Sequence, residues 1–249
     1  MVHLLLLVAL AQQHSDSSAL RLLQDASNQL ANAHSYHLQV LRRAEDSGKH
    51  HQSWEEQTLV AVVDGKRYRY EGMSDMGSAV AVSDGRTVTT YHVNEKLYKQ
   101  TSSAQNASST PIVADDESVL YEARHFNEEL SRLVAGLQSA SQLPEASLDI
   151  DGHVVRCQVI RFTQADAKTR TPDESFIDTF WINQQTGHIV RRRREDDSYI
   201  VLPGSDTHIP LHQVVTDTYT YFLNQREPDS TFASLLHQMQ SWFLNSLRC

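Results

Sequence analysis

Two periods of hydrophobic residues alternate along the chain. Between residues 16 and 33, apolar side chains recur every three or four positions, which predicts an amphipathic helix with one apolar side. Its apolar residues are Leu20, Leu23, Ala26, Leu30 and Ala33. The same period returns in residues 115–137 and in residues 231–247. The chain is therefore expected to contain three helices, the last of them a C-terminal amphipathic helix.

Between these helical stretches, apolar residues alternate with polar ones, which is the period of a β-strand. Asp64-Gly65, Asp84-Gly85, Asp151-Gly152 and Thr186-Gly187 each separate two such segments. Asp-Gly is a strong hairpin signal, because the tight turns that join antiparallel strands need positive φ. The polar residues 44–53 are predicted to form a loop. The pattern predicts an antiparallel meander in which consecutive strands pair.

The Ser-rich residues 101–110 are predicted to form a loop, and apart from Gly136 nothing marks a linker between two folded halves, so residues 12–249 are predicted to form a single domain. An antiparallel sheet can bury one face and leave the other in water. A twisted sheet of about ten strands is near the limit before it curls. The expected fold class is α+β, mainly antiparallel β: a curved open sheet, or half-barrel, with helices packed on its concave face.

The N-terminus carries an unbroken apolar run at residues 4–10, followed by Ala11. A short apolar segment ending in Ala9-Leu10-Ala11 is typical of a secretory signal peptide with a cleavage site after Ala11. We therefore predict a signal peptide at residues 1–11 and a periplasmic or secreted protein. The alternative is that these residues begin a buried N-terminal helix.

Composition and motifs argue against several function classes. The net charge of −9 disfavours binding to a phosphate backbone, so nucleic acid is not an expected partner. His34 and His37 are three residues apart, but the helix ends near them, so they need not share a face. His50-His51 carry no nearby Asp, Glu or Cys at ligand spacing, so no metal or cofactor is predicted. No nucleophile elbow, phosphate loop or zinc-protease motif occurs, so the protein is not expected to be an enzyme. Of the two cysteines, Cys157 lies in an apolar strand and Cys249 at the terminus, which leaves their pairing open.

Arg191–Arg194 is the sharpest run of charge in the sequence. Alternate side chains of a strand point to opposite faces, so the four arginines cannot form one flat basic patch. The simpler interpretation is a solvated strand end that pairs with the acidic residues 195–197. The alternative is a contact for an anionic headgroup.

Several segments resemble a known family. Residues 33–38 follow the first helix, residues 83–100 read SDGRTVTTYHVNEKLYKQ, and residues 180–190 form a strand, a Thr-Gly turn and a strand. In this order, over about two-thirds of the chain, they are similar to the outer-membrane lipoprotein carrier LolA and its relatives, including the sensor domain RseB. The resemblance implies an unclosed β-barrel that holds acyl chains beneath helices. The family's Arg-Pro pair is absent, because Asp64-Gly65 stands in its place.

The function expected from these observations is non-enzymatic binding and carriage of an apolar ligand, a lipid or the acyl chain of a lipoprotein. The residues predicted to line the cavity are Leu38, Val40, Tyr68, Tyr70, Val80, Val82, Tyr91, Trp181 and Tyr219. The alternatives are a sensor domain that regulates a membrane-bound partner, and a hydrolase whose site no motif marks. A membrane-associated partner would contact the apolar stripe of the C-terminal helix, namely Phe232, Leu236, Met239, Trp242 and Phe243.

Overall fold

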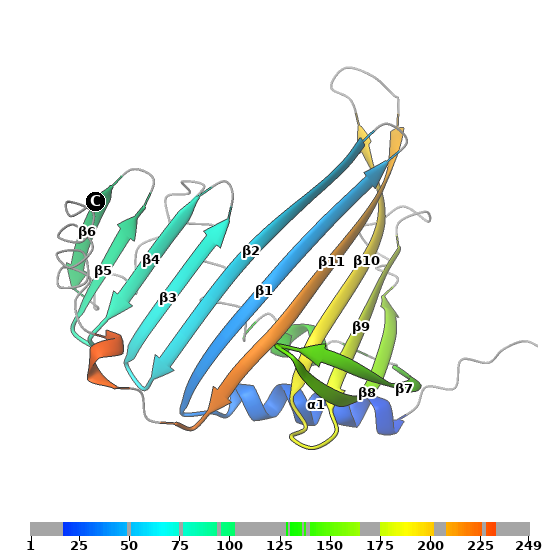
Figure 1. Cartoon of the computed structure of the whole chain (residues 1–249), viewed down its shortest axis with the longest axis horizontal. Helices are drawn as coiled ribbons and strands as arrows, with labels where there is room; N and C mark the ends of the chain where they lie inside the picture. Colours follow the sequence, from blue (N-terminus) through cyan, green and yellow to red (C-terminus); the bar gives the residue numbers. More distant parts are fainter. Residues whose placement is uncertain are drawn as a thin grey trace, which may run out of the picture.

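The computed structural model describes residues 17–48, 51–74, 77–93, 96–102, 128, 130–135, 137, 140–164, 175–201, 208–225 and 228–232. In these residues eleven strands form one antiparallel sheet, with the order β6-β5-β4-β3-β2-β1-β11-β10-β9-β8-β7. Strands β6 and β7 form its two edges and are not paired with each other, so the sheet is open (Figure 1).

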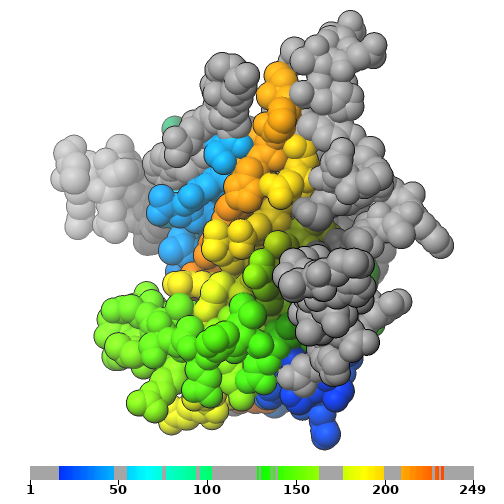
Figure 2. Space-filling model, turned by 90° about the vertical axis from the view of Figure 1, so that its right-hand side faces the viewer, coloured from blue at the N-terminus to red at the C-terminus, as the bar shows by residue number. Residues whose placement is uncertain are grey.

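The elements follow the chain in this order: α1 (Ser17–Ala31), β1 (Ser35–Gly48), β2 (His51–Asp64), β3 (Arg67–Ser74), β4 (Ser78–Ser83), β5 (Thr87–His92), β6 (Leu97–Ser102), β7 (Ser141–Ile150), β8 (His153–Gln164), β9 (Ser175–Asn183), β10 (Ile189–Val201), β11 (His208–Leu223) and the short 3-10 helix η1 (Asp229–Phe232). Strands β1–β6 and β7–β11 are two meanders, and β11 returns beside β1 to join them. Strands β1, β11 and β10 run side by side up the molecule (Figure 2).

The hairpin turns lie where the sequence predicted them. Gly65, Gly85, Gly152 and Gly187 all have positive φ and lie between paired strands. At the β7–β8 turn both central residues are left-handed, with φ 53° at Asp151 and 80° at Gly152. This is the backbone that the Asp-Gly signal implies.

The predicted loop at residues 44–53 is wrong. β1 continues to Gly48 and β2 begins at His51, so most of this polar stretch is paired strand. β1 lies between β2 and β11, and Ala44, for example, is opposite Glu55 on one side and Val215 on the other. Because hydrogen-bonding partners exist on both sides of β1, the backbone stays extended although its side chains are polar.

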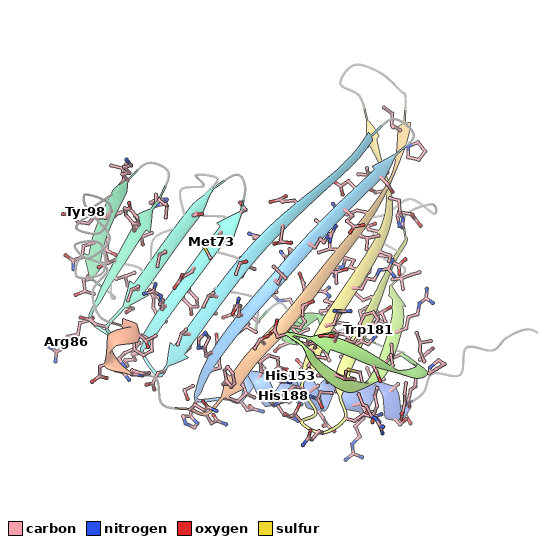
Figure 3. The ribbon with its side chains drawn as sticks, viewed as in Figure 1. Met73, Arg86, Tyr98, His153, Trp181 and His188 are labelled. Atoms are coloured by element: carbon pink, nitrogen blue, oxygen red, sulfur yellow. The ribbon has the colours of Figure 1, made fainter. Side chains whose placement is uncertain are left out.

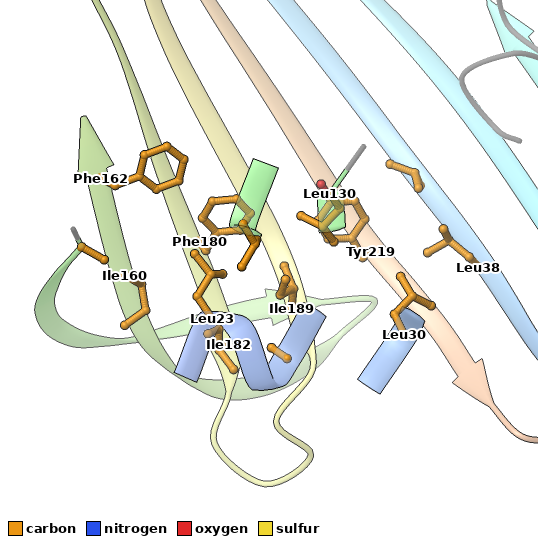
Figure 4. Close-up of a cluster of buried hydrophobic side chains, with 14 of the residues drawn as sticks. Leu23, Leu30, Leu38, Leu130, Ile160, Phe162, Phe180, Ile182, Ile189 and Tyr219 are labelled. Atoms are coloured by element: carbon orange, nitrogen blue, oxygen red, sulfur yellow. The ribbon is translucent and has the colours of Figure 1, made fainter. Parts of the chain in front are cut away.

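Helix α1 lies across the lower ends of the strands and buries one side against the sheet (Figure 1). Leu23, Ala26 and Leu30 are buried, as the spacing predicted, and Ala19 is buried beside them, whereas Leu20 is only partly buried and Ala33 lies beyond the helix. The buried residues pack against residues of β1, β2, β8, β9, β10 and β11 in one apolar cluster (Figure 4). We call the side of the sheet that packs against α1 the helix face. Removal of this apolar area from water, at about 25 cal/mol per Å², fixes α1 on the sheet.

The predicted fold class is confirmed: one large, curved, unclosed antiparallel sheet carries helices on one face. Residues 130–135 are helical, and Leu130 and Val134 join the same cluster as α1. The predicted signal peptide, residues 115–127 of the second helix and residues 233–247 of the third lie outside the described residues. Among the helices that the structure describes, none is long and apolar enough to cross a membrane.

Arg67, the first residue of β3, contacts the segment after β11. The Arg67 guanidinium donates a hydrogen bond of 2.6 Å from Nη1 to Asp229 Oδ1 and a second bond to Asp64. It also lies 4.7 Å from the centroid of the Phe232 ring. Phe232 is only 4% exposed, so this residue does not belong to an exposed docking stripe as the sequence predicted. The cation–π contact of Arg67 contributes to this burial.

We expect Arg67→Ala to release η1 from β3. The variant loses the charge-assisted bond to Asp229 and the cation–π contact together. Limited proteolysis with chymotrypsin should then cleave after Phe232 roughly tenfold faster than in the wild type, as expected for a locally destabilised segment. Arg86→Ala, which removes an exposed arginine from the β4–β5 turn, is the control. Equal cleavage rates for both variants would contradict this assignment.

Candidate ligand-binding face

The register divides the predicted lining residues between the two faces of the sheet. Residues directly opposite each other on paired strands share a face, and successive residues alternate. Leu38 is opposite both Ala61 and Tyr221, and Ala61 is opposite Tyr70. Following these rows, the residues on the helix face are Leu38, Val40, Tyr68, Tyr70 and Tyr219. Those on the opposite face are Val80, Val82, Tyr91 and Trp181 (Figure 3 labels Trp181 on β9).

Three of the five residues on the helix face belong to the core. Leu38, Val40 and Tyr219 are 2%, 1% and 3% exposed, and they form part of the cluster beneath α1. Leu38 and Tyr219 project to the same side of the sheet as Phe180 (Figure 4). These side chains stabilise the fold, so they are not the surface that a ligand would reach first.

Four half-buried tyrosines lie beside this core on the helix face. We call Tyr36, Tyr68, Tyr70 and Tyr221 the tyrosine patch. The rings of Tyr68 and Tyr70 stack with centroids 4.7 Å apart, and the other two pack against the apolar cluster. Burial, with a smaller contribution from the negative charge of Glu128, raises the pKa of Tyr36 to about 12. The patch is therefore neutral and aromatic at physiological pH, which suits contact with an apolar molecule.

Tyr221 connects the patch to the β9–β10 turn. Its ring stacks on the His188 ring with centroids 4.8 Å apart. Burial raises the pKa of Tyr221 far above its ordinary value, and burial lowers the pKa of His188. Both rings are therefore held in their neutral forms.

The stability of the protein should depend on pH through His188. Its pKa in the folded state lies below the unfolded value of about 6.5, so the unfolded chain binds a proton more readily. The free energy of unfolding is therefore highest above the unfolded pKa, where His188 is neutral in both states. It decreases as pH falls below that value, because the unfolded chain takes up the proton first. In urea titrations, the wild-type midpoint should fall more between pH 7 and pH 5 than that of His188→Phe, which cannot titrate. Parallel falls in the two proteins would contradict the prediction.

Next to the apolar core, the same face carries a cluster of five charged residues that sequence reasoning did not bring together. We call Arg42, Asp178, Arg192, Arg194 and Asp217 the arginine cluster. Arg42 donates from Nε to Asp217 Oδ1 at 2.8 Å and from Nη2 to Oδ2 at 3.3 Å. Arg192 binds Asp178 in the same two-pronged way, at 2.8 and 3.1 Å. Arg194 donates from Nε and Nη2 to Asp178 Oδ2 at 3.3 and 3.1 Å.

The aspartates of this cluster are deeply buried. The Asp178 side chain is 0% exposed and that of Asp217 is 3% exposed. Burial disfavours the charge of Arg192, but the hydrogen bonds and charge of Asp178 outweigh it, so the pKa of Arg192 is raised. Burial also raises the pKa of Tyr219, whose hydroxyl donates to Asp217 at 3.2 Å. The predicted solvated strand end is therefore wrong for Arg192 and Arg194, because Asp178 on β9 pairs with both of them.

Part of this cluster had a signal in the sequence. A bulge between Ile189 and Arg191 shifts the β9–β10 register by one residue beyond the turn, and this shift, which the sequence did not indicate, places Arg194 directly opposite Asp178. Phe176, Asp178 and Phe180 share one alternation phase, so one carboxylate stands among aromatic residues on a buried face. The pairing of Arg42 with Asp217 had no such signal, because these residues are 175 positions apart.

The described residues contain no metal-ligand group, and their one cysteine is buried. Among them, no group of three or more His, Cys, Asp or Glu side chains lies close enough to hold a metal ion. Cys157 is buried, and burial raises the pKa of its thiol, so the reactive thiolate is disfavoured. The other cysteine, Cys249, whose pairing with Cys157 the sequence left open, lies outside the described residues.

One known protein family matches part of the chain. The model of DUF2092, a family described as a predicted periplasmic protein, matches residues 19–116. No curated protein matches the chain.

Solved structures that match the chain do so with low sequence identity. Lipoprotein LppX from Mycobacterium tuberculosis is 13% identical, with 86% of this chain and 99% of that chain covered and a TM-score of 0.41. LprF from Mycobacterium bovis is 14% identical, with 83% and 93% covered and a TM-score of 0.41. A LolA superfamily protein from Nitrosomonas europaea is 14% identical, with 87% and 97% covered and a TM-score of 0.28. The last is a member of the superfamily that the sequence resembles.

Proposed function

We propose that the protein is a non-enzymatic, exported binding protein that carries an apolar ligand, a lipid or acyl chain, against the helix face of its open sheet. One observation carries this proposal: the tyrosine patch is a half-buried, uncharged aromatic surface continuous with the apolar core. Aromatic and apolar surfaces with few polar groups are typical of small-molecule sites.

Two further observations support the proposal. Among the described strands, the edge strands β6 and β7 do not pair with each other, so these strands do not close into a barrel around the helix face. The family that matches residues 19–116 is described as periplasmic, in agreement with the signal peptide that the sequence predicts.

Lipid binding can be measured directly. The purified protein should displace or retain a fluorescent fatty-acid probe, and mass spectrometry of the native protein should detect lipids that co-purify with it. Tyr70→Lys places a charge in the tyrosine patch, and we expect it to weaken probe binding at least about tenfold, because burial of an unpaired charge beside an apolar chain is costly.

Tyr91→Lys is the matched control. Tyr91 is also a half-buried strand tyrosine, but it lies on the opposite face of the sheet. The control should bind the probe like the wild type. A folded wild-type protein that binds no probe and carries no lipid would overturn the proposal and favour a sensor domain that acts through protein contacts.

A further inference from the structure

The arginine cluster contains more positive than negative charge. Arg42, Arg192 and Arg194 contribute three positive charges, and Asp178 and Asp217 contribute two negative ones, so 3 − 2 = +1. Asp178 is shared, since both Arg192 and Arg194 direct two hydrogen bonds to this one carboxylate. A single carboxylate neutralises one guanidinium, and the second is left with excess charge.

Arg194 is the member of the pair that a ligand can reach. Its side chain is 35% exposed, whereas that of Arg192 is 15% exposed. Its guanidinium lies 4.8 Å from the Phe176 ring centroid, which holds the group against the aromatic surface. Both of its bonds to Asp178 go to the same oxygen, Oδ2. A guanidinium has five N–H donors, so it can bind a second anion while it keeps its bonds to Asp178.

The position of the excess charge relative to the apolar core is fixed by the register. Arg42 and Arg192 are both opposite Asp217, two residues along β11 from Tyr219 and on the same face. Phe180, opposite Arg192, belongs to the apolar cluster. The helix face thus changes from apolar to cationic within one row of residues.

The row beyond Arg194 limits the charge of the ligand. Asp196 follows two residues later on β10 and shares the face of Arg194, and Asp46 on β1 accepts a hydrogen bond from Gln213 in the same row at 2.8 Å. These carboxylates repel a headgroup with several negative charges. A net charge of +1 beside an acidic row fits a headgroup with one negative charge.

We propose that the ligand is an amphiphile with a single negative charge, whose anionic headgroup binds Arg194 in the arginine cluster and whose tail runs along the helix face toward the half-buried tyrosine patch. This inference rests on the proposed function and specifies its ligand class. A fatty acid with its carboxylate and a phosphodiester lipid such as phosphatidylglycerol both fit this description, because a guanidinium binds either headgroup through paired N–H donors.

The experiment compares charged and uncharged ligands with the same tail. Binding of oleate and of methyl oleate to the wild type is measured at pH 8 by competition with a fluorescent fatty-acid probe. We expect oleate to bind at least about tenfold more tightly, the usual effect of one charge-assisted hydrogen-bonded contact. Phosphatidylglycerol and phosphatidylcholine, with matched tails, form the second arm and distinguish a phosphodiester ligand from a fatty acid.

Arg194→Gln should abolish this preference and leave methyl oleate binding unchanged. Asp178 keeps both of its hydrogen bonds from Arg192 in this variant, so the fold is retained. Arg193→Gln is the control, because it makes the same charge change on the same strand but on the opposite face, where Arg193 pairs with Glu195 at 3.6 Å. It should keep the preference.

The outcomes separate the two proposals. If none of the four lipids binds, the proposed function fails. If the charged and the uncharged member of each pair bind equally, or if the preference for the charged lipid survives in Arg194→Gln, an apolar ligand remains but the anionic site at the arginine cluster is overturned.

Discussion

Asp178→Ala should destabilise the protein by about 3–5 kcal/mol, the usual effect of removing one partner from a buried ion pair. The substitution leaves Arg192 and Arg194 without the carboxylate that receives their hydrogen bonds, and Arg192 is largely buried. The loss comes from an uncompensated buried charge, so it exceeds the net contribution of the pair itself. Urea unfolding of the variant and the wild type at pH 7 measures the difference.

Asp25→Ala is the matched control for this prediction. Asp25 pairs with Arg21 on α1 at 3.9 Å, but both side chains are exposed, at 63% and 83%. Solvent screens such a pair, so its loss should change the free energy of unfolding by less than about 0.5 kcal/mol. Similar losses for Asp178→Ala and Asp25→Ala would mean that the arginine cluster contributes no more than a surface ion pair.

The sequence predicted those parts of the fold that depend on neighbouring residues. Local patterns were sufficient for α1, for the four hairpin turns and for the open antiparallel sheet, because a helix period or a tight turn depends on neighbouring residues. The predicted loop at residues 44–53 failed because β11, which pairs with β1 along its whole length, is remote in the sequence. Non-local pairing replaced the local preference of polar residues for a loop.

The predicted lining residues separated for a related reason. Alternation within one strand predicts which residues share a face, but it does not state which face meets the helices. Tyr68 and Tyr70 were placed together correctly, whereas Val80 and Val82, one residue out of phase with the row of Tyr70 and Ala81, lie on the opposite face. The pairing register between β3 and β4 is what separates Val80 and Val82 from Tyr68 and Tyr70.

Phe180→Ala should be the most damaging truncation in the apolar core, with an expected loss of about 3–5 kcal/mol. Phe180 is 0% exposed and stacks on Phe162, with ring centroids 5.8 Å apart and planes 16° from parallel. Its ring also lies 5.6 Å from the Arg192 guanidinium, so it supports the arginine cluster from the apolar side. The measurement is urea unfolding, with Val154→Ala as control, because Val154 is 75% exposed and its truncation should cost less than about 0.5 kcal/mol.

Phe180→Leu separates the filling of space from the contacts of the aromatic ring. Leucine restores most of the lost volume but neither the stacking on Phe162 nor the contact with Arg192. An aromatic pair contributes about 0.5–1.5 kcal/mol beyond the area it buries. The loss of unfolding free energy in Phe180→Leu should therefore be less than half of the loss in Phe180→Ala. If leucine and alanine are equally destabilising, the ring contacts dominate at this position. If neither variant is destabilised, Phe180 does not connect the apolar core to the arginine cluster.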